Sequence, residues 1–379
     1  MHKTQYKRWV VALPTNGADS AVRGLEPAAT DPKEILAHPQ RSCRLCGAHG
    51  SVLHSGLADR QSPVPGVWSF RRCANRQCDL TWLDPLPLEQ ELAKAYGDYY
   101  THERRDATAG LFARAMNTMK SGYLASRFGY REGVGVLARI AGWAPWLYPG
   151  RPRELDLSVM WLEAARTGRL LDIGAGSGWL VENMNALGWD AQGLDVDPVA
   201  VSNARERGLN FHQGSVADQH YSEATFDAVT LCHSIEHVSD PVALVTECLR
   251  IVKPGGQVIM VTPNTDSLGH RVFGRAWFPL DPPRHLLLFN RRSMTSMITS
   301  AGAGRFRIFS TCRDANGIFL ASRAIRRYGR FDVNAPRSAL DKIAGRVAQT
   351  AEILALLAKP WCGEELVAIV EKPRSALGS

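Results

Sequence analysis

Two pairs of cysteines lie near the N-terminus of this 379-residue chain, spaced C-x2-C and C-x4-C. Thiolate sulfur is a preferred ligand of zinc, and four thiolates fill a tetrahedral shell without leaving a position for substrate. A glycine directly after the first pair suits the tight turn that directs two thiolates at one ion. The spacing predicts a structural zinc site, with reduced buried thiols as the alternative. Its ligands would be Cys43, Cys46, Cys73 and Cys78.

A glycine-rich turn follows the apolar run at 170–173, in a pattern typical of a buried strand that opens into a helix. Open α/β sheets bind ligands at this kind of junction. Asp195 ends the next predicted strand, where a carboxylate can hydrogen-bond both hydroxyls of a ribose. A nicotinamide dinucleotide fits less well, because Trp179 stands where its fingerprint requires a small residue. Asp172, before the first glycine, also suits a cofactor with a cationic amino-acid end better than an anionic pyrophosphate.

Three polar residues follow the predicted fourth strand: His233, Glu236 and His237. On a helical turn this spacing would place them on one face. Histidine titrates near neutral pH and suits removal of a proton from a hydroxyl. We expect His237 and His233 to act in catalysis, as a base relay or, with Glu236, as ligands of a divalent metal. His285 is a further catalytic candidate, because its segment follows the fifth strand. For all three histidines, a structural role in the loops is the alternative.

Strands and helices alternate from residue 168 onward, which predicts a parallel sheet with right-handed crossovers. A helix over 240–252 is the best marked, because Asp240 can cap it, Pro241 suits its first turn, and Lys-Pro-Gly-Gly at 253–256 ends it. A basic helical insertion precedes the last strand and contains four arginines, Arg323, Arg326, Arg327 and Arg330. The predicted strands cover 169–174, 190–196, 211–215, 226–232, 256–263 and segments near 306 and 365.

Four parts of the chain can be separated by composition. An arm is expected at 1–39, the cysteine module at 40–90, a helical connector or cap at 91–162, and the α/β domain at 163–379 with the insertion at 313–362. Since the cysteine module precedes the α/β domain, we expect loss of Cys43 to destabilise the module and to leave cofactor binding largely intact.

Charge and hydropathy limit the location and the partners. A net charge of +8 favours anionic partners, such as nucleic acid, phosphorylated carriers or an acidic membrane surface. The first 20 residues lack the apolar core of a secretory signal. Arg139 and Glu352 interrupt the most apolar stretches short of the roughly 20 residues that span a bilayer. We expect a cytoplasmic protein, with a peripheral contact at the inner face of the membrane as a further option.

Four segments over residues 168–310 carry a family resemblance: DIGAGSG, GLDVDP, FDAVTLCHSIEHVSDP and LRIVKPGGQVIMVTPN. They resemble class I S-adenosylmethionine (SAM)-dependent methyltransferases of the ubiquinone-biosynthesis and type 11/12 groups. The resemblance implies a Rossmann-like α/β fold with a seven-stranded, mostly parallel sheet, here with a small N-terminal zinc ribbon and helical cap insertions. In ubiquinone O-methyltransferases an acidic residue stands at the position of His233, followed by the same Glu-His pair.

The same resemblance implies SAM as the cofactor. The glycine turn would hold its methionine end, the acid of the second strand its ribose, and the residues after the third strand its adenine. The cofactor site predicted in this way comprises Asp172, Gly174, Ala175, Gly176, Gly178, Asp195, Val196, Ser215, Val216 and Cys232.

We therefore expect methyl transfer to a hydroxyl, or a carbon, of a small or carrier-linked acceptor such as a sugar, glycan, quinone-like or lipid-linked compound. The Asn/Asp-Pro-Pro-aromatic motif of exocyclic-amine methyltransferases is missing after the fourth strand, which disfavours adenine and cytosine amino groups. A cysteine ribbon before such a domain resembles sugar C-methyltransferases and, less closely, a ribosomal RNA guanine methyltransferase family. The alternatives are an RNA methyltransferase that grips RNA with the zinc module and basic surface, and a zinc-ribbon interaction protein with an inactive cofactor fold.

Overall fold

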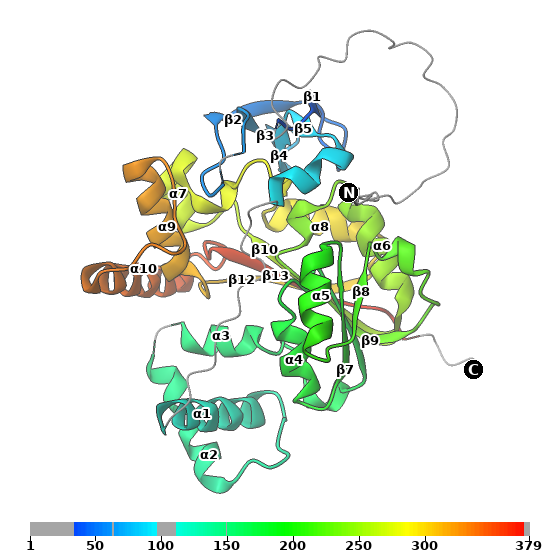
Figure 1. Ribbon diagram of the computed structural model, residues 1–379, viewed down its shortest axis with the longest axis vertical. Coiled ribbons are helices and arrows are strands. Elements are labelled where there is room, and N and C mark those ends of the chain that lie inside the picture. Colours follow the sequence, from blue (N-terminus) through cyan, green and yellow to red (C-terminus); the bar gives the residue numbers. More distant parts are fainter. Residues whose placement is uncertain (1–33, 63, 97–110, 149, 375–379) are drawn as a thin grey trace, which may run out of the picture.

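A computed structural model describes residues 34–62, 64–96, 111–148 and 150–374 (Figure 1). Most of the predicted arm, and residues 97–110 of the predicted connector, lie outside these residues. The α/β domain occupies the centre of the molecule, the cysteine module lies at one end, and α1 and α2 lie at the other (Figure 1). Among the described helices, none combines the length and the apolarity needed to cross a bilayer.

The central sheet has seven strands in the order β12-β13-β10-β9-β6-β7-β8, and β13 alone runs antiparallel to its neighbours within this described sheet. This confirms the predicted Rossmann-like fold. The segment predicted at 256–263 begins earlier, because the chain keeps pairing through a bulge between Val252 and Gln257. The strand bounds are β6 Arg169–Ile173, β7 Asp190–Asp195, β8 Phe211–Gln213, β9 Phe226–Cys232, β10 Val252–Pro263, β12 Arg305–Thr311 and β13 Glu365–Glu371.

Both faces of this sheet are buried, as expected for a parallel sheet with helices on each side. Adjacent residues of a strand alternate between two hydrophobic clusters: Val229 and Met260 belong to one, and Ala228 and Ile259 to the other. The helices α4 Trp179–Asn185 and α5 Pro198–Glu206 pack on β7, while α6 Pro241–Ile251 packs on β10 and α8 Arg291–Ser300 on β12 and β13. Asp240 caps α6 as predicted, its side chain accepting a hydrogen bond from the backbone of Ala243.

The cysteine module is a small antiparallel sheet that the α/β domain extends. Its order is β11-β4-β3-β2, and β11 comes from the loop after β10. A separate pair, β1 with β5, joins residues 37–38 of the predicted arm to residues 86–87, so the module begins before residue 40. The strands are β1 Ala37–His38, β2 Gly50–Leu57, β3 Trp68–Cys73, β4 Thr81–Asp84, β5 Leu86–Pro87 and β11 Leu287–Leu288.

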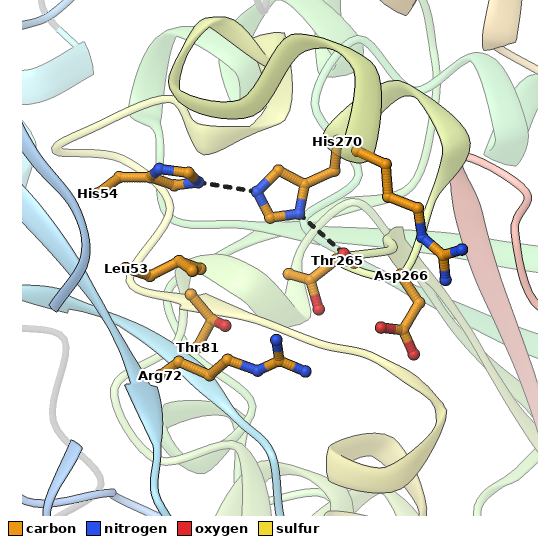
Figure 2. Close-up of a pocket in the computed structure, with 8 residues that line it drawn as sticks. Leu53, His54, Arg72, Thr81, Thr265, Asp266 and His270 are labelled. Carbon is orange, nitrogen blue, oxygen red and sulfur yellow. Dashed lines mark hydrogen bonds between the residues drawn. The ribbon is translucent and has the colours of Figure 1, made fainter. Parts of the chain in front are cut away.

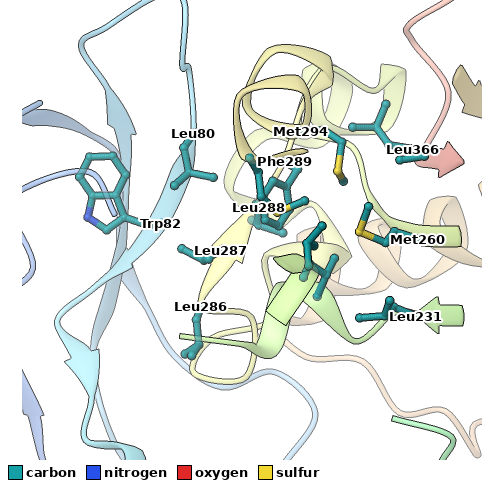
Figure 3. Packing of buried hydrophobic residues seen from close by; sticks show 14 of the residues in the cluster. Leu80, Trp82, Leu231, Met260, Leu286, Leu287, Leu288, Phe289, Met294 and Leu366 are labelled. Carbon is teal, nitrogen blue, oxygen red and sulfur yellow. The ribbon is translucent and has the colours of Figure 1, made fainter. Parts of the chain in front are cut away.

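One hydrophobic cluster runs from this module into the α/β domain. Figure 3 shows Leu80 and Trp82 of the module beside Leu286–Phe289, which in turn approach Met260 and Leu366 of the central sheet. A shared core of this kind couples the stability of both parts.

The remaining helices belong to the connector, to the loops around the sheet and to the insertion. The 3₁₀ helix η1 leaves the module, and α1, α2, η2 and α3 form the helical connector. The insertion at 313–362 is helical as predicted, and its two helices α9 and α10 pack together. The bounds are η1 Glu89–Tyr96, α1 Leu111–Arg127, α2 Val136–Ala141, η2 Ala144–Leu147, α3 Arg151–Leu157, η3 Ala164–Arg166, η4 Ala217–Gln219, η5 Ile235–His237, α7 Leu268–Phe273, η6 Gly274–Ala276, η7 Phe278–Leu280, α9 Ala315–Tyr328 and α10 Ala339–Ala358.

Candidate functional site

A cavity of about 650 Å³ opens at the carboxyl ends of β6, β7 and β8. Its volume suits a small-molecule cofactor, and it lies where open α/β sheets bind ligands. Five of the ten predicted cofactor residues line it: Gly174, Asp195, Val196, Ser215 and Val216. The other five are not among its lining residues: Asp172 lies in β6, Cys232 ends β9, and Ala175, Gly176 and Gly178 lie in the turn before α4.

The glycine turn can be built only with glycine at its first position. Gly174 has φ +70°, and a Cβ there would lie 2.4 Å from the hydroxyl of Ser234. Gly178 also has a positive φ, and it immediately precedes α4. The amide of Gly176 donates to the Asp195 carboxylate at 2.8 Å, which fixes the turn against the end of β7.

Two carboxylates, the half-buried Asp195 and the buried Asp172, give this region a negative character. Asp195 accepts from the amides of Gly176 and Asp197, and burial nevertheless raises its pKa. Asp172 is fully buried and accepts from Thr230 at 2.8 Å; burial, with a smaller effect from Asp195, raises its pKa to about 7. A cationic ligand would relieve this unfavourable burial, whereas an anionic pyrophosphate would increase it. The residues therefore fit SAM, whose sulfonium and amino group are cations.

The cavity includes residues that the sequence did not indicate. Glu89 and Leu92 of η1 line it, although they directly follow the cysteine module. This revises the expectation that the module can be lost without effect on the cofactor site. No motif marks Glu89 or Leu92, because their proximity to the glycine turn depends on the packing of the module on the domain. The further lining residues include Ser234, Val238, Ala243, Leu244 and Arg250.

His237 lines the same cavity. Its Nδ1 lies 3.0 Å from the carbonyl oxygen of Arg284 and 2.9 Å from the hydroxyl of Tyr96. Because a carbonyl only accepts, Nδ1 carries the hydrogen and Nε2 of the neutral ring carries the lone pair. Burial, and then the nearby His285, lower the pKa of His237 to about 4. The ring is therefore neutral at physiological pH, with Nε2 able to accept a proton.

His285 is 4.7 Å from His237 between ring centroids, in an edge-to-face arrangement. Its Nδ1 lies 2.6 Å from the carbonyl oxygen of Pro279 and donates a hydrogen bond to it. Glu236, His237 and His285 offer ligand atoms that all lie within 4.8 Å of one another and could hold a metal ion. The predicted metal set included His233 instead of His285.

His233 is not on one helical face with Glu236 and His237, which corrects that expectation. The 3₁₀ turn η5 covers only Ile235–His237, and His233 precedes it with φ +54°. Its Nδ1 lies 3.3 Å from Glu236 and its Nε2 lies 2.8 Å from Glu365. Burial would lower the pKa of His233, but these two carboxylates raise it to about 10.

Arg313, from the start of the insertion, completes this cluster by donating to Glu365. Its guanidinium also lies 3.1 Å from Nε2 of His233. We assign the hydrogen of Nε2 to the bond with Glu365, because the carboxylate then accepts from both cations. His233 is thus an imidazolium and cannot act as a base in this arrangement. Its catalytic role stays a prediction.

The four cysteines lie together, as predicted from their spacing. Sγ of Cys43 is 3.6 Å from Sγ of Cys78, and Sγ of Cys46 is 3.4 Å from Sγ of Cys73. Four thiolates at ~2.3 Å from a tetrahedral zinc would lie roughly 3.8 Å apart, so the geometry fits this metal. All four are free thiols. The longer second spacing is accommodated by a turn in which the amides of Cys78 and Asp79 both donate to Asn75.

A second, polar cavity of about 400 Å³ lies between the cysteine module and the loop after β10 (Figure 2). Figure 2 shows His54 of the module and His270 of the domain facing each other, with 3.0 Å between their Nε2 atoms. His270 donates from Nδ1 to Thr265 and therefore accepts from His54. Burial is the main cause that lowers the pKa of both, to about 4 for His54. The charges of this cavity thus come from Arg72, Arg271 and Asp266.

The chain is similar to known methyltransferases over the part that builds the first cavity. Residues 151–303 match a family described as a methyltransferase domain. The ubiquinone biosynthesis O-methyltransferase of Alkalilimnicola ehrlichii is 38% identical over 125 residues, which are 31% of this chain and 51% of that protein. Its counterpart in Aromatoleum aromaticum is 42% identical over 105 residues, 25% of this chain and 44% of that protein. The chain thus spans about half the length of the curated relatives it matches.

Among solved structures, a SAM-dependent methyltransferase from Archaeoglobus fulgidus aligns with a TM-score of 0.39 at 17% identity, covering 60% of this chain and 94% of that one. A SAM-dependent methyltransferase from Mesorhizobium loti aligns with a TM-score of 0.40 at 15% identity, covering 57% of this chain and 97% of that one.

Proposed function

We propose that the chain is a SAM-dependent methyltransferase that acts on a hydroxyl group, a proposal supported by the match of residues 151–303 to a methyltransferase domain family. One observation carries the proposal. The cavity that holds Asp195 and the glycine turn is also lined by His237, a neutral histidine in a tautomer that can accept a proton. The predicted cofactor residues and a candidate base therefore line one cavity.

SAM supplies, when bound, an electrophilic methyl group on a sulfonium. In the proposed site, the carboxylate of Asp195 would accept hydrogen bonds from the ribose hydroxyls. The buried carboxylate of Asp172 would balance the positive charge of the cofactor. His237 takes the proton of the acceptor hydroxyl at Nε2. Tyr96 and the carbonyl of Arg284 hold the orientation of its ring. Glu89 and Leu92 cover the cavity from the module side, which excludes water and orients the reactants.

The acceptor class follows from the relatives and from the kind of base. The relatives named above are ubiquinone O-methyltransferases, which favours a phenolic or quinone-like hydroxyl over a sugar or a carbon atom. A phenol suits a histidine of lowered pKa, because it loses its proton more readily than an aliphatic alcohol. The alternative of RNA methylation gains no support from these relatives.

The test uses the full-length protein, methyl-labelled SAM and an alkyl-substituted catechol, with mass spectrometry of the product. We expect one labelled methyl group per catechol, together with loss of turnover in His237→Gln and in Asp195→Ala. His38→Gln is the matched control, because His38 is exposed on β1. In a parallel reaction with cell extract, label in RNA rather than in a small molecule would contradict the proposal.

We further propose that the four cysteines bind one structural zinc ion. The thiolates would close its coordination shell, so the ion would stabilise the module and take no part in methyl transfer. Elemental analysis of purified protein should then find about one zinc per chain. Metal-free protein in which the four thiols react freely under native conditions would exclude the site.

A further inference from the structure

Helix α10 exposes several large apolar side chains and buries two polar ones. The residues packed against the protein are Gly345, Gln349 and Glu352, and the last two are almost completely buried. On the opposite side lies a stripe with helical spacing that is 59% to 80% exposed, made of Leu340, Ile343, Val347, Leu354 and Leu357. A surface helix normally has the reverse arrangement. Among the described residues, nothing covers this stripe.

The buried polar side of α10 is held by specific contacts. Gln349 donates to the carbonyl groups of Cys312 and Arg313, and Glu352 accepts from the amide of Glu364 at 2.9 Å. Gly345 allows a close approach to Asn316 of α9. These contacts fix the rotation of the helix, so the stripe cannot turn inward without leaving buried polar groups unpaired.

A second apolar surface adjoins the first. The segment from α2 to the end of η2 exposes Trp143, Trp146, Leu147 and Tyr148, with Leu147 88% exposed. Arg346 of α10 lies 4.3 Å from the ring of Tyr148, which joins the two surfaces. We call the combined area the α2–α10 face; its further exposed apolar residues are Val136, Leu137 and Ile140.

The charges around the α2–α10 face select the kind of partner. Residues 337–359, which contain α10 and its flanks, have four Lys and Arg against two Asp and Glu, a net charge of +2. Glu352 is one of these acids and is buried, so the exposed excess of cations is larger still. Arg337, Lys342 and Lys359 are exposed near the apolar stripe. Pairing with a second copy would bring two such cationic surfaces together, which is unfavourable.

We propose that the α2–α10 face binds the surface of an anionic lipid membrane. An amphipathic helix with apolar residues on one side and Lys or Arg beside them lies in the interface of a bilayer. Tryptophan and tyrosine prefer the headgroup level, where the ring is apolar and the polar atom is hydrated. Juxtaposed cations add attraction to anionic headgroups. The three features occur together on this face, and the inference does not depend on methyl transfer.

The experiment is vesicle flotation of the full-length protein with phosphatidylcholine alone and with an equal mixture of phosphatidylcholine and phosphatidylglycerol. We expect flotation only with the anionic vesicles, and less of it at high salt because the ionic attraction is screened. Leu354→Ser/Leu357→Ser and Trp143→Ser/Leu147→Ser should each lower the affinity for these vesicles, by about tenfold for each apolar side chain removed from the bilayer. Arg337→Glu/Lys342→Glu should reduce binding to anionic vesicles as well.

Val67→Ser/Val199→Ser is the matched control, because these exposed valines lie on the module and on α5. Circular dichroism checks that each variant is folded. The proposal is overturned if the wild type does not float, or if the variants of the α2–α10 face float as well as the control. A wild-type dimer in light scattering that Leu354→Ser/Leu357→Ser dissociates, without flotation, would identify a second copy as the partner and equally overturn it.

Discussion

Arg284 joins the cysteine module to the α/β domain. We expect Arg284→Met to lower the free energy of unfolding of the protein. The guanidinium is fully buried between Asp59 of the module and Asp281 of the domain. Its donors make five hydrogen bonds, two to each carboxylate and one to the carbonyl oxygen of Ala95. Arginine has five N–H groups, so each is satisfied.

The magnitude follows from what Arg284→Met leaves behind. Asp59 and Asp281 are 1% and 4% exposed, and the variant would bury both carboxylates without their cation. Removal of one partner from a buried ion pair costs about 3–5 kcal/mol. In the wild type, burial would raise the pKa of Asp281, but Arg284 dominates and lowers it to about 2. The stability that this carboxylate contributes is thus complete above about pH 4 and is lost as the pH falls toward 2.

Urea denaturation at pH 7 measures the effect. Arg323→Met is the control, because Arg323 forms an exposed pair with Asp341 and should lose at most about 1 kcal/mol. Arg284→Met/Asp59→Asn/Asp281→Asn should recover part of the loss, because it removes the uncompensated charges. An Arg284→Met protein within about 1 kcal/mol of the wild type would refute the reasoning.

Three other substitutions test the site. Gly174→Ala should weaken SAM binding by at least about tenfold in calorimetry, because the new Cβ would lie 2.4 Å from the Ser234 hydroxyl at a φ of +70°; unchanged affinity would exclude this cause. Cys43→Ser should abolish the zinc content in elemental analysis. It should also weaken SAM binding, because Glu89 and Leu92, at the end of the module, line the cavity; an unaltered SAM affinity would show that the module does not support the cavity. His237→Gln should lower kcat by about 10²–10⁴-fold. Wild-type activity should fall as the pH drops through about 4, where His237 becomes protonated. A His237→Gln protein as active as the wild type would exclude the role of His237 as a base.

The sheet and the cofactor turn could be predicted because their signals are local. Each predicted strand of the α/β domain is present, and Asp240 caps α6, because alternation, turn glycines and capping residues act over a few neighbouring positions. Likewise, the cysteine spacing was enough to predict that the four thiols lie together, although a long hairpin separates the two pairs in the sequence.

Contacts between distant segments could not be predicted. His285 lies beside His237 because two loops of the α/β domain that are distant in sequence pack together. The pairing of β11 with β4 and the place of Glu89 at the cavity depend on how the module packs on the domain. His233 shows the same limit. The spacing correctly predicted Glu236 as a neighbour, but it could not reveal the second carboxylate, Glu365, which is 132 residues away.

The central claim is that the cavity at the ends of β6 and β7 binds SAM through Asp195, and calorimetry tests it most directly. Titration of S-adenosylhomocysteine into the wild type should give one site per chain. Asp195→Ala should bind at least about tenfold more weakly, because a charged hydrogen-bond partner of the ribose is lost. NAD should give no heat of binding. Tight binding of NAD, or equal affinity of wild type and Asp195→Ala for S-adenosylhomocysteine, would contradict the account.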